Sequence, residues 1–567
     1  MMKTRHIVYI SFVILLASAC KREDFLDRFP LDAISEQTYF KNENDLKLYV
    51  NRLYDYLPVQ RARNPTAEDS TDARSDNYAM GNINTFLSSQ YVVPPSGGGW
   101  AISDWANIRN VNFFLKRYNN AQIDQTIKNY YAGEARFFRA LFYWDKVKRF
   151  GAVPWLSSDL SDTSSMALYG PRQPHKVVMD SVLADLNYAV TNTAEATNTN
   201  FAGRITKDVA LALKARICLW EGTFRKYHAL GDEQNYLREA AAAAETLMNS
   251  GRYQIYKTGN PSSDYYNLFI QEELKGNKEA ILARRYIRNV SMHNLTRDIS
   301  NVWPALTKNF VRSILMRDGR PTSLSPLYQG DDTPDNEQMN RDPRYTQIIA
   351  TRGFSFTNNA DGTKDLMTLP RIPSVVTGYA LVKNYSPDPL QWVQSQSTLD
   401  LFIFRYAETL LIFAEAKAEL GEATQAVIDR TINEIRSRVG MANMVIATLV
   451  KDPQSDFPTL PVLLDEIRRE RRIELVGEGL RFDDLLRWKA GELIENPETI
   501  LGMKLTPALR AQYPASQISN VQVNANNYIR VYPNITARVW TDKMYLYPIP
   551  TDQLTLNPAL LPQNTGW

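Results

Sequence analysis

The sequence is poor in the residue types that metal sites and nucleophilic enzyme sites require. Its 567 residues include only two cysteines and four histidines, and the motifs HExxH, GxSxG and GxxxxGK followed by Ser or Thr do not occur. The histidines, which lie far apart in the sequence, are His6, His175, His228 and His293. We therefore expect no metal, no cofactor and no covalent catalysis.

A large excess of one charge and long apolar runs are also missing. The formal net charge is +3, far from the basic excess typical of nucleic-acid-binding proteins, so nucleic acid is not an expected partner. The apolar stretch from Ile7 to Leu16 is shorter than the roughly 20 residues that a membrane-spanning helix needs. With 44% hydrophobic and 22% charged residues, the chain is expected to fold around one large core or two smaller ones.

The first twenty residues have the organisation of a secretory signal that ends at a lipid-attachment site. Lys3 and Arg5 precede the apolar stretch, and small residues lead up to Cys20. The sequence ASAC resembles the bacterial lipobox, in which the cysteine is acylated and becomes the new N-terminus. Acyl chains such as palmitate contribute about 0.8 kcal/mol per buried methylene, so an acylated Cys20 predicts membrane anchoring without a spanning helix.

The second cysteine, Cys218, lies in ALKARICLWEG on the same helical face as Leu211 and Ala215. We interpret Cys218 as a reduced core residue, since free cysteine behaves as a small hydrophobic side chain. A disulfide between Cys20 and Cys218 is the alternative for a secreted chain.

Apolar residues recur at helical spacing in segments that are expected to pair as hairpins. These segments are 46–57, 137–144, 177–190, 206–222, 237–251, 404–418 and 428–439. Gly421 is expected to end the helix before it, and the alanines of EAKAELGEATQAVID resemble a tetratricopeptide hairpin. Because the hairpins are scattered rather than tandem, we predict a discontinuous helical scaffold; a plain helical bundle would show the same stripes.

Between residues 253 and 399 the composition shifts toward Asn, Asp, Pro, Gly, Ser and aromatic residues, which predicts long loops with short strands at most. Loops of this length are usually functional. Several aromatic residues lie in loop-like sequence: Tyr78, Trp100, Trp105, Tyr266, Trp303, Tyr328 and Trp392. Such rings stack on sugar rings while neighbouring polar groups bind the hydroxyls, so the set favours a binding surface over an active site. Packing of a loop onto the scaffold is the alternative role for each of them.

Three patterns invite other interpretations. In SFTNNADGTKDLMT, an EF-hand alignment on Gly362 places Thr357 and Thr368 where Asp and Glu are required, which leaves only calcium held by irregular loops as a hypothesis. Adjacent carboxylates at 331–332 and 483–484 would suit a glycosidase, but with 62 acidic residues such pairs arise readily.

The segment DEIRRERRIELVGEGLRFDDLLRWK alternates arginines with acidic residues. Asp465 and Arg469, and Arg471 and Glu474, lie at helical pairing distances, which indicates a structural ion-pair network. The glycines at 477 and 479 are expected to close this helix.

Four stretches together resemble the SusD/RagB family of outer-membrane nutrient-binding lipoproteins. They are CKREDFLDRFP, FRYAETLLIFAEAKAELG, LLDEIRRERRIELVGEGLRFDDLLRWK and the closing YLYPIP with LTLNPALLPQNTGW. The resemblance implies a mainly α fold in which tetratricopeptide-like hairpins form a scaffold for a loop-rich ligand-binding region. It divides the chain into a signal peptide at 1–19, an N-terminal helical region at 20–230 and a C-terminal region at 231–567 that contains the insertion 253–399.

The resemblance also implies a function and a location. Family members are not enzymes; they lie on the outer face of the outer membrane and capture glycans, or in some members peptides, for a SusC-like TonB-dependent transporter. Lys21, Glu23 and Asp24 after the lipidated Cys20 are similar to the family's surface-export signal, although Arg22 interrupts the acidic run. We therefore expect a surface glycan-binding lipoprotein, with a peptide-capturing member or a secreted glycosidase as the alternatives.

The ligand contacts follow from the resemblance only by region. Glycan-binding members build an aromatic platform from a segment before a helix that opens like WANIRNVNFFL and from a mid-chain insertion. In this sequence those regions contain Asp76, Tyr78 and Trp100, and then Trp303 and Tyr328. These five residues are the predicted ligand contacts.

Overall fold

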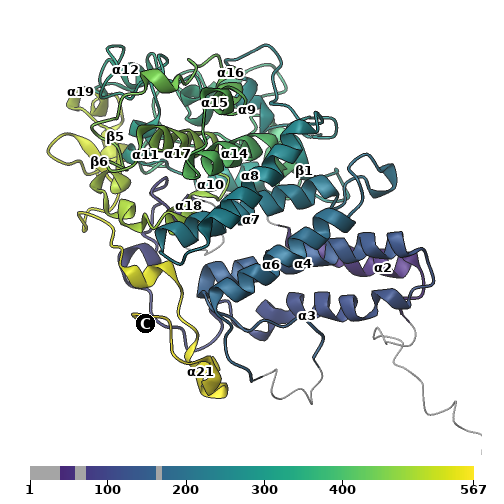
Figure 1. The fold of residues 1–567 in the computed structure, drawn as a ribbon. Helices are drawn as coiled ribbons and strands as arrows, with labels where there is room; N and C mark the ends of the chain where they lie inside the picture. Colours follow the sequence, from purple (N-terminus) through teal and green to yellow (C-terminus); the bar gives the residue numbers. More distant parts are fainter. Residues whose placement is uncertain (1–38, 58–71, 161–168) are drawn as a thin grey trace, which may run out of the picture.

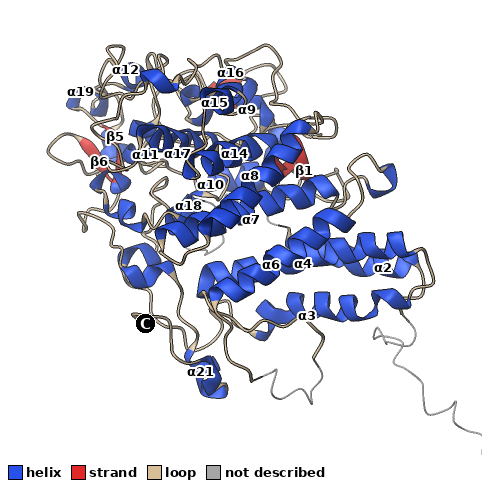
Figure 2. Ribbon diagram, viewed as in Figure 1, coloured by secondary structure: helices blue, strands red, loops and turns tan. Residues whose placement is uncertain are grey.

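The computed structural model describes residues 39–57, 72–160 and 169–567. Cys20 and the predicted signal peptide 1–19 lie outside these ranges. The described part is mainly helical, with short strands confined to two-stranded sheets (Figures 1 and 2), as expected. None of its helices combines the length and the apolar character that crossing a bilayer demands.

The helices and strands have the following bounds. The helices of the first half are α2 (Glu43–Asn51), α3 (Ile102–Arg117), α4 (Gln125–Phe150), α6 (His175–Asn192), α7 (Lys207–Tyr227), α8 (Glu233–Asn249) and α9 (Asp264–Leu268). Next are α10 (Leu295–Asn301), α11 (Lys308–Ser313), α12 (Pro334–Gln338), α13 (Tyr345–Ile348), α14 (Tyr406–Glu419), α15 (Gln425–Asp429) and α16 (Ile432–Ser437). The last helices are α17 (Val462–Glu474), α18 (Arg481–Arg487), α19 (Pro507–Arg510), α20 (Ala515–Ile518) and α21 (Thr551–Leu556). The strands are β1 (Ala280–Arg284), β2 (Ser355–Asn358), β3 (Lys364–Leu366), β4 (Leu401–Arg405), β5 (Leu501–Lys504) and β6 (Tyr528–Arg530).

The long helices pack in a continuous series, although a long insertion separates two of them along the chain. α4 contacts α6, α6 contacts α7, and α7 contacts α8; α8 then contacts α14, and α14 contacts α17 (Figure 1). The chain between α8 and α14 contains the loop-rich insertion, so the scaffold is continuous in space and discontinuous in sequence. This arrangement is the predicted one.

Small residues set the spacing of the α7 and α8 pair. Ala240 and Ala244 on α8 are fully buried, and a Cβ on Gly222 of α7 would come within 3.0 Å of the backbone nitrogen of Leu237. The two helices can therefore approach closely only because these positions carry small side chains. Cys218 of α7 is a free thiol buried in the large helical core, which agrees with its interpretation as a core residue.

One predicted helix is divided in two. The apolar stripe at 428–439 suggests a single helix, but the backbone breaks between α15 and α16 at Thr431, which has φ −127° and ψ −86°. The Thr431 hydroxyl donates to the carbonyl of Val427 at 2.6 Å, a local bond that competes with the regular helix. Ile428, Ile432 and Ile435 nevertheless share one core, because the break leaves all three on the buried side.

One small sheet joins the first part of the insertion to the strand that follows it. β1, which lies within the insertion, and β4, which follows it, pair antiparallel, with Ala280 opposite Arg405 and Arg284 opposite Leu401. Within the insertion, β2 and β3 form a hairpin whose turn contains Asp361. The Asp361 carboxylate accepts from the backbone N–H and the hydroxyl of Thr363, at 2.9 and 2.7 Å, which accounts for its role in the turn.

The arginine-rich segment forms α17, and its charged side chains are buried rather than solvated. Arg471 pairs with Asp484 at 2.9 Å, and Asp465 pairs with Lys451 at 2.6 Å. The Glu474 carboxylate receives three guanidinium groups at 2.8 to 3.1 Å, from Arg344, Arg405 and Arg438. The predicted ion-pair network is present, but its partners come mainly from other elements and not from the next turn of α17. Gly477 and Gly479 follow the helix with φ of +77° and +76°, as expected for residues that end it.

Candidate ligand-binding pocket

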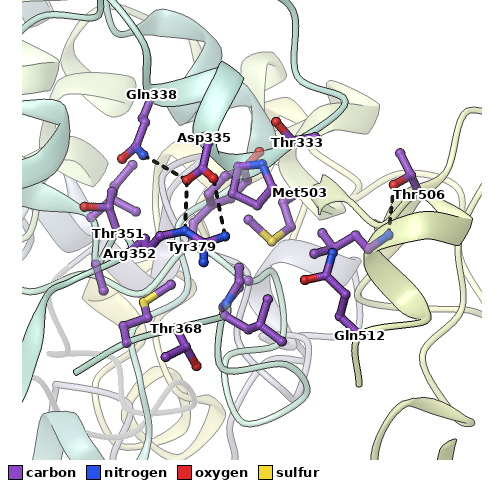
Figure 3. A pocket seen from close by; sticks show the side chains of 18 of the residues that line it. Thr333, Asp335, Gln338, Thr351, Arg352, Thr368, Tyr379, Met503, Thr506 and Gln512 are labelled. Carbon is purple, nitrogen blue, oxygen red and sulfur yellow. Dashed lines mark hydrogen bonds and ion pairs between the residues drawn. The ribbon is translucent and has the colours of Figure 1, made fainter. Parts of the chain in front are cut away.

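A pocket of about 180 Å³ lies in the loop-rich region, where segments far apart in the sequence meet. Figure 3 shows Gln338, Thr351 and Arg352 on the left and Thr506 and Gln512 on the right, with Asp335 and Met503 between them. Its lining includes residues of the insertion and residues from β5 and α19, which follow more than a hundred positions later. The pocket therefore exists only in the folded chain.

Two short helices each form part of the pocket wall, and both begin with Thr-Pro. The Thr333 side chain accepts from the N–H of Asn336 at the start of α12, and the Thr506 side chain accepts from the N–H of Leu509 at the start of α19. The proline that follows each threonine occupies the first turn, where its fixed φ suits a helix. Its missing N–H costs no hydrogen bond there, because N–H groups of the first turn have no acceptor within the helix. These caps fix the direction of both helices although each has only one turn.

The floor of the pocket is apolar. It includes Ile349, Met367, Met503 and Leu509, together with the buried rings of Tyr345 and Tyr379. The Tyr379 hydroxyl already donates to the Glu337 carboxylate at 2.8 Å, so its polar end is used inside the protein. Gly378 has φ +81°, and a Cβ there would come within 2.4 Å of the Met503 sulfur, so this position requires glycine for Met503 to reach the floor.

An ion-pair network supports the α12 wall. The Lys308 ammonium lies 2.7 Å from Glu337 and 2.6 Å from Asp331, and the Tyr528 hydroxyl donates to Asp331 at 2.6 Å. Burial favours a higher pKa for Asp331, but Lys308, Tyr528 and Lys504 outweigh it and lower the pKa to about 2. Burial disfavours the charged form of Lys308, yet the two carboxylates hold its pKa above the usual value. Asp331 and Lys308 therefore stay ionised at neutral pH beneath this wall.

The mouth of the pocket carries exposed polar groups. Asp335 and Arg352 form an ion pair at 3.3 Å, with 48% and 58% of their side chains exposed, and the Gln338 amide also donates to Asp335 (Figure 3). Exposed pairs of this kind contribute roughly 0 to 1 kcal/mol, so the pair can open toward a ligand at little cost. Gln512 lies across the mouth, where its amide makes one long bond of 3.5 Å to the Ala508 carbonyl.

The predicted contacts Asp76 and Tyr78 are buried beside the segment that follows Trp303. Asp76 is fully buried and bound by Arg481 at 2.7 Å and Arg472 at 3.1 Å, and these guanidinium groups overcome the effect of burial and hold its pKa well below the usual range. Tyr78 is 2% exposed and forms a β-bridge with Leu306. The structure therefore brings the two predicted regions together, because the backbone at Tyr78 pairs with the backbone at Leu306.

The three predicted tryptophan and tyrosine contacts have different surroundings. Trp303 is 6% exposed and packs on Phe356 and Tyr385, with ring centroids 5.4 and 4.9 Å apart. Trp100 is 5% exposed and belongs to the helical core, where it makes an edge contact with Phe150 at 4.7 Å. Tyr328 is half-buried near the Lys308 network, and burial raises the pKa of its hydroxyl. Of the five predicted residues, Tyr328 has the most accessible side chain.

Sequence reasoning did not identify the pocket, and it named Thr368 only as a residue unsuited to an EF-hand. Asp335, Arg352, Met503 and Gln512 lie in turn-rich or irregular sequence, and no spacing rule relates the first two to the last two. The repeated Thr-Pro helix start is the one local signal that marks both walls.

Comparison with protein families accounts for most of the chain. A family model described as the SusD family matches residues 245–567, which is more than half of the sequence. The chain belongs to the SusD family. A second model, described as starch-binding associating with outer membrane, matches residues 24–219.

Relatives and solved structures agree over nearly the full length. The chain is 22% identical to SusD-like protein P2 of Formosa agariphila, over 98% of this chain and 99% of that protein. It is 25% identical to SusD-like protein P38 of the same organism, over 85% of this chain and 91% of that protein. A SusD-like protein from Bacteroides fragilis superposes with a TM-score of 0.70 at 24% identity, covering 95% of this chain and 100% of that one. A SusD-like carbohydrate binding protein from the same species gives 0.69 at 23%, covering 92% and 100%.

Membership of the SusD family confirms the predicted family and the mainly helical SusD-like fold. It supports a glycan-binding role and association with the outer membrane. It also suggests that this SusD-family protein binds its ligand without catalysis.

Proposed function

We propose that this protein is a lipid-anchored outer-membrane protein that captures oligosaccharides and delivers them to a SusC-like TonB-dependent transporter. The observation that carries the proposal is the pair of family matches, one to the SusD family and one to a starch-binding family associated with the outer membrane. Similar folds include a carbohydrate binding protein from Bacteroides fragilis and a protein described as laminarin binding, which has a TM-score of 0.54.

The anchor in this proposal is Cys20. Acylation there attaches the chain to the membrane, and Lys21, Glu23 and Asp24 direct it to the outer face. More than one acyl chain is needed for stable attachment, because a single chain gives only marginal and reversible binding.

Ligand binding in this proposal is non-covalent and uses a surface that exists before the ligand arrives. The pocket lined by α12 and α19 is one contact, and Tyr328, near Lys308, is another. Asp76, Tyr78, Trp100 and Trp303 hold the loops in place through packing and ion pairs. Affinity for a free oligosaccharide is weak, and closure over the transporter retains the bound ligand.

The test is a binding screen on the mature chain with a polysaccharide panel and, separately, a tryptic protein digest. We expect at least one glycan to bind, as measured by affinity electrophoresis and calorimetry, and to be recovered without shortening. Binding of peptides alone would favour a peptide-capturing protein, and release of shorter sugars would show a glycosidase.

The anchor and the partner need a second experiment in cells. Metabolic labelling with a fatty acid is expected to label the parent chain and not Cys20→Ser, and purification of the parent chain is expected to recover a TonB-dependent transporter. A labelled Cys20→Ser chain would contradict the assignment of the anchor.

A further inference from the structure

The pocket differs from a sugar-stacking platform in the chemistry of its floor. Its deep surface combines aliphatic and thioether side chains with the buried rings of Tyr345 and Tyr379, and no tryptophan occurs among the described residues that line it. The Tyr379 hydroxyl donates its proton to Glu337, so it cannot donate the same proton to a sugar hydroxyl. A bare sugar ring pressed against this floor would leave hydroxyls without partners, at a cost of about 1 to 3 kcal/mol each.

The size of the pocket limits what it holds. Sites for drug-sized ligands have volumes of roughly 300 to 1,000 Å³, whereas this pocket has about 180 Å³. An oligosaccharide cannot enter as a whole, but one substituent of a sugar ring can. The methionines of the floor, Met367 and Met503, suit a small apolar group because their unbranched side chains adapt to its shape.

The mouth of the pocket carries the hydrogen-bonding groups that the floor lacks. Gln338 and Gln512 offer amide groups, Thr351 and Thr368 offer hydroxyls, and Arg352 forms an exposed ion pair with Asp335. A ligand that is apolar at its tip and rich in hydrogen-bonding groups behind the tip matches this gradient from floor to mouth (Figure 3).

Resting on the proposed glycan-binding function, we propose that the pocket binds the acetyl group of an acetylated sugar unit. The methyl group lies on the floor formed by Met367, Met503 and Leu509, and the carbonyl and the ring hydroxyls bind the polar groups of the mouth. The pocket thus selects acetylated glycans over the same glycans without acetyl groups.

The test uses single sugars, because the pocket holds one unit. N-acetylglucosamine and N-acetylgalactosamine are compared with glucose and galactose by saturation-transfer NMR on the full mature chain in detergent. We expect the acetyl methyl protons to receive the strongest saturation, and the sugars without an acetyl group to receive at least tenfold less.

Two variants block the pocket from different segments, and one matched variant does not. Ala508→Phe and Thr368→Phe place a ring at exposed positions that line the pocket, so neither burdens the core. Ala515→Phe makes the same change as Ala508→Phe at an exposed position on α20 outside the pocket. We expect both blocking variants to abolish the methyl signal and Ala515→Phe to retain it.

The outcomes separate this inference from the proposed function. Absence of methyl saturation from the parent chain, or an unchanged signal in both blocking variants, overturns the acetyl assignment while polysaccharide binding still stands. Peptide binding that Ala508→Phe blocks, without any acetyl-sugar signal, also overturns it and assigns the pocket to an apolar peptide side chain. Failure of every polysaccharide to bind would instead remove the proposed function itself.

Discussion

The surroundings of α17 and the pocket between α12 and α19 use polar residues in opposite ways. Around α17, arginine and glutamate side chains are almost fully excluded from solvent, and the Glu474 carboxylate alone is bound by three guanidinium groups. At the pocket, the charged pair of Asp335 and Arg352 is about half exposed, and the buried surface is apolar. Charge holds the scaffold together in the first region and remains available to a ligand in the second.

This difference predicts where substitutions act. Removing one member of a buried ion pair leaves the other charge buried without a partner, which costs roughly 3 to 5 kcal/mol. Removing one member of an exposed pair costs roughly 0 to 1 kcal/mol. Variants in the two regions should therefore separate stability from binding.

The largest loss of stability is expected for Glu474→Ala. Although burial favours a higher pKa for this carboxyl, Arg438, Arg405 and Arg344 outweigh that effect and hold it well below its usual range. The variant should lose about 5 kcal/mol in the free energy of unfolding or fail to fold, as measured by urea denaturation followed by circular dichroism. Glu434→Ala is the control, because its pair with Lys257 is exposed on both sides; equal losses in the two variants would contradict the comparison.

Trp303→Ala tests whether an aromatic residue predicted as a ligand contact belongs to the core. Its ring is 6% exposed and packs on Phe356 and Tyr385, so truncation should cost about 3 to 5 kcal/mol through the cavity that it leaves. The half-buried Tyr328 is the matched case, and Tyr328→Ala should cost clearly less. If thermal denaturation shows Trp303→Ala to be as stable as the parent chain, the core assignment of this ring is wrong.

An intermediate and pH-dependent effect is expected for Asp331→Asn. The pKa of Asp331 is about 2 in the folded chain against 3.8 for the free side chain, so its stabilising effect is present above pH 3.8 and is lost as the pH falls through 2. At pH 6 the variant should be less stable by roughly 1.5 to 3 kcal/mol, since it weakens hydrogen bonds to a charged group.

The measurement for Asp331→Asn is urea denaturation at pH 6 and at pH 2. The difference between the parent chain and the variant should shrink at the lower pH, where the parent carboxyl begins to be protonated. Asp332→Asn is the control, because Asp332 is 74% exposed and pairs only with Lys504 among the described residues. A difference that stays constant between the two pH values would show that the ionisation of Asp331 does not support the pocket wall.

The scaffold was predictable because its signals are local. Apolar stripes, alanine contact positions and Gly421 identify α7, α8 and α14 within a few residues, since each pattern is complete within one helix. The division between α15 and α16 was not predictable from the stripe, because the isoleucines keep their spacing while the Thr431 backbone departs from the helix.

The pocket was not predictable, because no part of it is local. Arg352 and Gln512 come from segments that only the fold brings together, and the sequence does not show which aromatic rings the loops cover. Trp303 illustrates the second difficulty: its loop-like sequence is compatible with a ligand contact or with packing, and in the structure it belongs to a small core of the insertion that includes Phe356 and Tyr385. The charge pattern of α17 predicted a network but not its partners, since Arg471 and Asp465 bind groups outside the helix.

The smallest effect on stability is expected for Arg352→Ala at the mouth of the pocket. Its guanidinium pairs with Asp335 at 3.3 Å with both side chains about half exposed, so the free energy of unfolding should change by roughly 0 to 1 kcal/mol. Added salt should reduce this difference further, because exposed pairs are screened. Urea denaturation at low and high ionic strength measures both effects. A loss well above 1 kcal/mol that salt does not reduce would show that Arg352 stabilises the fold as the buried charges around α17 do. The charges at the mouth of the pocket would then not differ from those of the scaffold.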